Sequence, residues 1–117
     1  MTKARINADD VDAVAAMNGY ITATITNSSI PMTLNRRYAI TGTGPGVLPT
    51  FTTNGEFVIV EFKTSAGVTS TVGRNSQTID GSATDDTYTG GGNGPVIRYE
   101  FVSPGSVSSR LIEGLPA

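Results

Sequence analysis

The sequence predicts a mostly β domain, an antiparallel sandwich or small barrel of jelly-roll or immunoglobulin-like size, with a short N-terminal helix or arm. Short runs rich in Thr, Val and Ile fill residues 19–113, and Gly, Pro, Asn and Asp separate them without room for crossover helices. The chain has 117 residues, the usual size of a domain with one core. We therefore expect an arm over residues 1–18 and a β domain over residues 19–117.

The first 18 residues have a helical pattern that the rest of the chain lacks. Asn7 is a candidate N-cap, and the aspartates after it would complement the positive end of a helix dipole. Val11, Val14 and Met17 provide a thin apolar stripe, and an Asn-Gly pair then supplies a stop signal. Because so short a helix is marginal in water, we expect it to order on this domain or on a neighbouring chain.

After Gly19 the apolar residues alternate with polar ones, as in half-buried strands. The segment 56–63 is apolar on both faces, which places it at the centre of the fold. The pattern predicts about eight strands, at residues 21–26, 32–40, 47–52, 56–63, 68–72, 87–89, 96–102 and 107–112.

Turn signals and glycine-rich loops separate these strands. Asn54-Gly55 and Asp80-Gly81 indicate tight turns because Asn, Asp and Gly tolerate positive φ. The loops at residues 42–46 and 90–94 are rich in glycine, but neither is followed by Gly-Lys-Ser/Thr and a helix. Neither loop is therefore expected to bind phosphate.

The composition removes most reactive chemistry. The chain has no cysteine and no histidine, which excludes disulfides, thiolate catalysis and the usual zinc sites, and leaves Ser and Thr without the common base. Asp80, Asp85 and Asp86 are clustered, but the twelve-residue calcium loop is absent and Asp-Gly turn chemistry explains Asp80. We expect no metal and no cofactor.

The charge balance argues against nucleic-acid and membrane partners. The net charge is −2, and Arg36-Arg37 is the only adjacent basic pair, which we interpret as solvated or interface charges and not as a phosphate-binding patch. No apolar stretch follows the first basic residues as in a signal peptide. The longest run of large apolar residues, Phe57–Val60, is far shorter than the roughly 20 residues that span a bilayer.

Catalysis by paired carboxylates is the remaining enzymatic alternative. Glu61 and Glu100 lie on the clearest strands and could face each other across a cleft. Pairing with cross-strand cations such as Lys63, Arg98 or Arg110 is the simpler interpretation. We therefore expect the protein not to be an enzyme.

Several short segments follow one another in a recognisable order: the opening Met1–Arg5 with the Asp-rich piece after it, then Arg37–Ile40, Gly55–Val60, Gln77–Ser82 and Val96–Phe101. This order resembles that of structural proteins of tailed bacteriophages, in particular capsid decoration proteins and tail-fibre β modules, over about residues 31–112. Such modules often finish on a Trp-containing strand, whereas this chain has Arg110-Leu111-Ile112 at that place.

The resemblance implies a non-enzymatic virion protein, frequently trimeric, that is made in the host cytoplasm and then carried on the particle. The first hypothesis is a decoration, or cement, protein that binds the assembled shell and bridges copies of the major capsid protein. The alternative is a tail-fibre or tail-tip module that trimerises and contacts the tail or the host surface. In either case the expected interface residues are Lys3, Arg5, Val11, Val14, Met17, Arg36 and Arg37.

Overall fold

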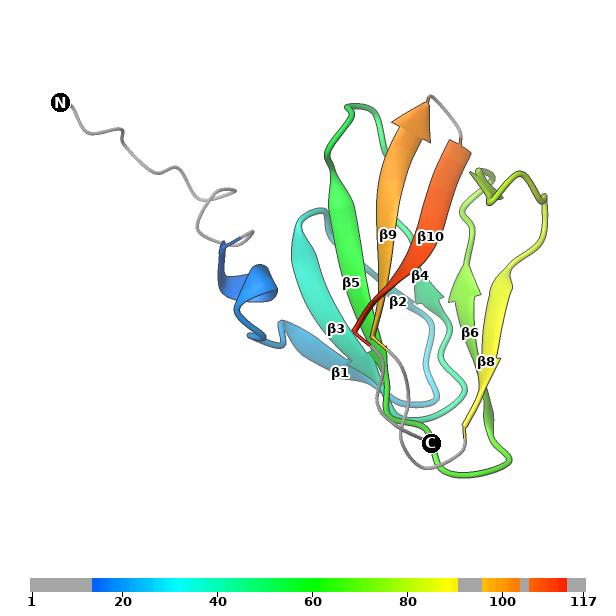
Figure 1. Ribbon diagram of the computed structural model, residues 1–117. Coiled ribbons are helices and arrows are strands. Elements are labelled where there is room, and N and C mark those ends of the chain that lie inside the picture. Colours follow the sequence, from blue (N-terminus) through cyan, green and yellow to red (C-terminus); the bar gives the residue numbers. More distant parts are fainter. Residues whose placement is uncertain (1–13, 91–95, 104–105, 114–117) are drawn as a thin grey trace, which may run out of the picture.

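The computed structural model describes residues 14–90, 96–103 and 106–113. Within these ranges the protein is mostly β, as predicted, and its strands form two facing sheets (Figure 1). The larger sheet has the order β1-β3-β5-β9-β10-β7, and the smaller has the order β2-β4-β6-β8. The strands are β1 (Ala23–Ile25), β2 (Ile30–Pro31), β3 (Arg36–Ile40), β4 (Gly46–Val47), β5 (Phe57–Phe62), β6 (Thr69–Gly73), β7 (Thr78–Ile79), β8 (Asp86–Thr89), β9 (Val96–Ser103) and β10 (Ser106–Glu113).

The first six strands pair in parallel, which corrects the prediction of an antiparallel sandwich. In the larger sheet β1 pairs with β3 and β3 with β5, and in the smaller sheet β2 pairs with β4 and β4 with β6, all in parallel. Consecutive strands enter opposite sheets, so the chain winds through three successive coils, each adding one strand to each sheet. The loops of this half are crossings between sheets and not hairpins.

Antiparallel pairing is found where the later strands close the two sheets. β9 pairs with β5 and with β10, and β8 pairs with β6, all antiparallel. β7 adds to β10 in parallel at the edge of the larger sheet. The predicted antiparallel arrangement is therefore limited to this part of the fold.

The long strand predicted at residues 32–40 is divided in the structure. Residues 32–35 leave the smaller sheet after β2 and enter the larger one at β3. Asn35 has a φ of 62° at the bend, a left-handed conformation that asparagine tolerates better than most residues. The apolar and polar residues of the sequence keep alternating across this bend. The sequence pattern therefore did not reveal that the chain passes from one sheet to the other here.

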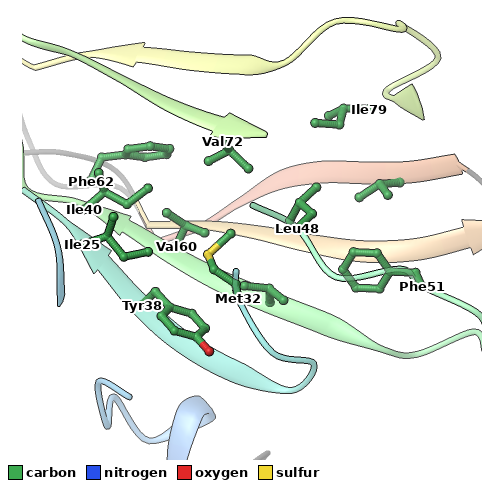
Figure 2. Packing of buried hydrophobic residues seen from close by; sticks show 12 residues of the cluster. Ile25, Met32, Tyr38, Ile40, Leu48, Phe51, Val60, Phe62, Val72 and Ile79 are labelled. Atoms are coloured by element: carbon green, nitrogen blue, oxygen red, sulfur yellow. The ribbon is translucent and has the colours of Figure 1, made fainter. Parts of the chain in front are cut away.

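The prediction that residues 56–63 form the central strand is confirmed. β5 is paired on both edges, by β3 and β9. Its side chains are buried on both faces, with Glu61 the one that is only partly covered. Val58, Val60 and Phe62 face the smaller sheet, where Figure 2 shows two of them packed in the core.

The main core fills the space between the two sheets (Figure 2). Phe62 stacks on Tyr88 of the smaller sheet with 5.0 Å between ring centroids. The buried members of this core are Ile25, Met32, Tyr38, Ile40, Leu48, Phe51, Val58, Val60, Phe62, Val72, Ile79 and Val107.

Both predicted tight turns are confirmed. Asp80 has a φ of 53° and Gly81 a φ of 82°, the signs that a type I′ turn requires at both central positions. Ile79 and Ser82 exchange both backbone hydrogen bonds across it, at 2.9 and 3.0 Å. At the other turn Gly55 has a φ of 95°.

Candidate interaction surface at the N-terminal helical segment

The helical segment, residues 14–17, ends in a capping motif that its sequence predicts. Gly19 has a φ of 95°, its N–H donates to the carbonyl of Ala16 at 3.1 Å, and the N–H of Tyr20 donates to the carbonyl of Ala15 at 2.9 Å. These are the two hydrogen bonds of a Schellman cap, which satisfies carbonyls that have no partner within a helix. The predicted stop at Asn18-Gly19 is thus confirmed, whereas the predicted N-cap, Asn7, lies outside the described residues.

The helical segment packs on its own domain. Ala16 is 1% exposed and forms a second apolar cluster with Phe57 and Ile59. Both partners lie on β5, and their side chains point to the face opposite the main core. The larger sheet therefore has an apolar layer on each face, and the arm and the β domain are in contact at this point.

Arg37 links this helical segment to the sheet. Its Nε donates to the carbonyl of Ala16 at 2.8 Å, and its Nη1 donates to Oε2 of Glu61 at 2.7 Å. The cation thus meets the C-terminal end of a helical turn, where the carbonyl dipoles favour positive charge. Lys63 approaches the other oxygen of Glu61 at 3.4 Å.

The burial of Arg37 corrects one sequence-based interpretation. Arg37 is 8% exposed and is held within the chain, so it is not a solvated charge. The sequence analysis named Lys63 among the cross-strand partners, but Lys63 contacts Glu61 from two residues further along the same chain. The cross-strand cation, and the shorter contact, is Arg37 on β3. No local signal identified this pair, because it depends on the parallel register of β3 and β5.

Exposed apolar side chains gather at the helical segment. Val14 is 56% exposed, Met17 49% and Tyr20 66%, and within residues 14–90 and 106–109 these are the exposed large apolar side chains. The segment lies beside β1, which forms one edge of the larger sheet (Figure 1). We call Val14, Met17 and Tyr20 the apolar surface. Isolated exposed apolar residues are ordinary, but three on one short segment indicate an interaction surface.

The predicted interface residues are therefore separated by the structure. Val14 and Met17 belong to the apolar surface, Arg36 is partly buried on β3, and Arg37 is an internal link. The predicted positions Lys3, Arg5 and Val11 lie outside the described residues. Tyr20 was not identified from the sequence, although its place directly after the helix stop is a signal that could have indicated it.

The strand positions of the alternative acid–base pair do not lie opposite each other in the larger sheet. Glu61 is opposite Val96, whereas Glu100 is opposite Phe57. The two positions are four residues apart along β5, which corresponds to about 13 Å at ~3.3 Å per residue.

The carboxylates of two of the clustered aspartates, Asp80 and Asp85, accept hydrogen bonds from other residues of the chain. Asp80 accepts hydrogen bonds from the N–H and the hydroxyl of Ser109, and Asp85 accepts from the N–H of Arg74 at 3.0 Å. Among the described residues there is no group of three acidic side chains placed to hold a metal ion. Within the same ranges, no helix has the length and apolar character that a membrane span needs.

The chain matches no protein-family model and no curated protein.

Proposed function

We propose that this protein is a non-enzymatic structural protein of a tailed-bacteriophage virion, a decoration protein that binds the major capsid protein through the apolar surface. The sequence resemblance supports the class, and the gathering of Val14, Met17 and Tyr20 on one anchored segment is the observation that carries the binding role. The partner surface would be apolar and would repeat over the shell.

The anchoring of the helical segment suits it to this role. The Schellman cap, the packing of Ala16 on Phe57 and the Arg37 hydrogen bond hold the segment on the sheet before any partner binds. A surface that is already ordered loses less conformational entropy on binding. Each large apolar side chain that becomes fully buried contributes about 1.5–3 kcal/mol, and β1 offers a sheet edge that a partner strand could extend.

Binding to shells tests the proposal. Purified protein at micromolar concentration should co-sediment with mature empty shells of the phage that encodes it, and should raise the melting temperature of the shells. Met17→Glu and Tyr20→Glu should each abolish co-sedimentation, because each introduces a charge into the apolar surface without disturbing the core. Ala83→Glu adds the same charge at an exposed position after β7 and serves as the matched control.

Absence of the wild-type protein from the shell pellet, together with an unchanged shell melting temperature, would refute the decoration role. Equal co-sedimentation of the Met17→Glu, Tyr20→Glu and Ala83→Glu variants would refute the assignment of the surface. The two outcomes are separate, because shell binding through another face would preserve the first part of the proposal.

The parallel coils favour a tail-fibre module as the second candidate. In the stretch from β1 to β6, each parallel coil adds one strand to each sheet. Such an architecture can be lengthened by stacking further coils. A fibre module would associate through the apolar surface around a threefold axis. Light scattering would then give the mass of a trimer in the absence of shells, and Met17→Glu would reduce it to that of a monomer.

A further inference from the structure

A pocket of about 360 Å³ lies between two crossings from the smaller to the larger sheet. One crossing joins β2 to β3 and the other joins β4 to β5. The volume is within the usual range for small-molecule sites, roughly 300–1,000 Å³. The described residues that line it are Met32, Thr33, Leu34, Asn35, Pro49 and Glu56.

Glu56 presents a fixed carboxylate to this pocket. Its Oε1 accepts hydrogen bonds from the backbone N–H groups of Thr52 at 2.8 Å and Thr53 at 3.0 Å. These two donors set the orientation of the side chain. Its Oε2 accepts no hydrogen bond from the described residues, although a carboxylate oxygen can accept two.

Asn35 presents a fixed amide. The N–H of Asn35 donates to the carbonyl of Phe57 at 2.6 Å, and its Oδ1 accepts the N–H of Phe57 at 3.3 Å. Because Oδ1 is the acceptor, Nδ2 is the other atom of the amide, and it donates to no described residue. An acceptor on Glu56 and a donor on Asn35 are thus held by backbone contacts and have no hydrogen-bond partner in the described part of the chain.

The other lining residues are Thr33 and three apolar residues, and backbone hydrogen bonds hold two of these four in place. Met32 is buried and Leu34 and Pro49 are half-buried. The N–H of Met32 donates to the carbonyl of Val47 at 2.8 Å, and the N–H of Thr33 donates to the hydroxyl of Tyr38 at 2.8 Å. These lining residues are therefore already in place when a ligand arrives, which lowers the entropic cost of binding.

We propose that this pocket binds one pyranose unit of a carbohydrate through a pair of adjacent hydroxyls. One hydroxyl donates to Oε2 of Glu56, its neighbour accepts from Nδ2 of Asn35, and the C–H face of the ring covers Leu34 and Pro49. A primary amine would pair with Glu56 but leave the Asn35 amide unsatisfied. An anion would be repelled by Glu56. A vicinal diol satisfies both groups and is neutral.

Titration with methyl glycosides tests this site. Methyl α-glycosides of glucose, galactose, mannose and N-acetylglucosamine are added at millimolar concentration to the ¹⁵N-labelled full chain. At least one should shift the amide resonances of residues 33–35 and 52–56 in a saturable way. n-Butylamine, the cationic comparison, can pair with Glu56 alone and should give no saturable shift over the same concentration range.

Two conservative variants assign the contacts. Glu56→Gln keeps an acceptor for Thr52 and Thr53 but replaces the second oxygen by a donor, and Asn35→Asp keeps the acceptor for Phe57 but removes the amide donor. Each should weaken glycoside binding about tenfold or more, since a hydrogen bond with one charged or fixed partner is lost. Asp85→Asn removes one exposed negative charge outside the pocket and should bind as the wild type does.

The absence of a saturable shift with all four glycosides overturns the proposal. A saturable shift with n-butylamine alone, or wild-type affinity in both the Glu56→Gln and Asn35→Asp variants, also overturns it. The melting temperature of each variant is measured as well, to show that the variant is folded. Because the two substitutions are independent, one folded variant is sufficient for the test. The inference does not rest on shell binding, and Met17→Glu should retain the glycoside response.

Discussion

Nη1 of Arg37 on β3 lies 2.7 Å from Oε2 of Glu61 on β5, on the face of the larger sheet that turns away from the main core. The same guanidinium donates to the carbonyl of Ala16. One side chain therefore joins two parallel strands and the helical segment. Arginine can do this because its donors diverge in a fixed plane.

We expect Arg37→Met to lower the free energy of unfolding by about 2–3 kcal/mol, because Glu61 and the Ala16 carbonyl both lose a charged donor. Glu61→Gln alone should cost less, since the amide still accepts a hydrogen bond. In the double variant the two losses should not add, because Arg37→Met already removes the ion pair that Glu61→Gln weakens. Urea unfolding of the four proteins measures the coupling.

Lys63→Met is the matched control for this cycle. The Lys63 side chain is 59% exposed, and exposed ion pairs contribute little, about 0–1 kcal/mol. If Lys63→Met lowered the free energy of unfolding as much as Arg37→Met does, the two cations would stabilise Glu61 equally. That result would contradict the structure.

Phe57→Ala should cost about 3–5 kcal/mol, the range for large core aromatic residues. Phe57 is 5% exposed and packs with Ala16 and Ile59, so its loss leaves a cavity under the helical segment. Thermal and urea unfolding measure the change. Val14→Ala, at a position 56% exposed, should stay within about 0.5 kcal/mol, and a loss below 1 kcal/mol for Phe57→Ala would mean that the ring is not buried in solution.

Deletion of residues 1–16 tests the attachment of the arm. A detached arm would leave the thermal transition of the β domain unchanged. The structure instead predicts a loss of about 2–3 kcal/mol, because Phe57 and Ile59 are uncovered and Arg37 loses its acceptor on Ala16. A melting temperature equal to that of the full chain would show that the contact contributes nothing.

Gln77 should be the most sensitive polar position of the described core. It is 4% exposed, its Oε1 accepts the N–H of Phe51 at 2.9 Å, and its Nε2 donates to the carbonyls of Pro49 and Arg74 at 2.9 and 3.2 Å. Gln77→Leu leaves all three backbone groups without this partner and should cost about 2–4 kcal/mol. Gln77→Glu keeps the acceptor for Phe51 but loses the amide donor, and it should also destabilise the protein. Urea unfolding measures both variants, and an unchanged free energy of unfolding in both would contradict this role of Gln77.

Some of the architecture follows from local chemistry, and for that reason it could be predicted. The Asp80-Gly81 turn, the stop at Asn18-Gly19 and the burial of β5 on both faces depend on residues adjacent in the chain. Turn residues act through their own φ, and alternation indicates the two faces of a strand.

The parts of the candidate sites differ in how far they could be predicted. Val14 and Met17 were identified by helical spacing, and they are exposed. The pocket was not predicted, because Asn35 and Glu56 come from different crossings and meet only when β3 and β5 pair. The same pairing buries Arg37, which the sequence treats as a surface charge.

From the sequence alone came the β class, the turn positions, the central strand and the end of the helical segment. Only the tertiary structure decided that the first six strands alternate between two sheets and pair in parallel with the strand two places along the chain. The physical reason is that alternation reports which face of a strand is buried, whereas hydrogen-bonded neighbours are chosen by contacts distant in sequence. Those contacts also place Arg37 against Ala16 and Glu61, and Asn35 beside Glu56.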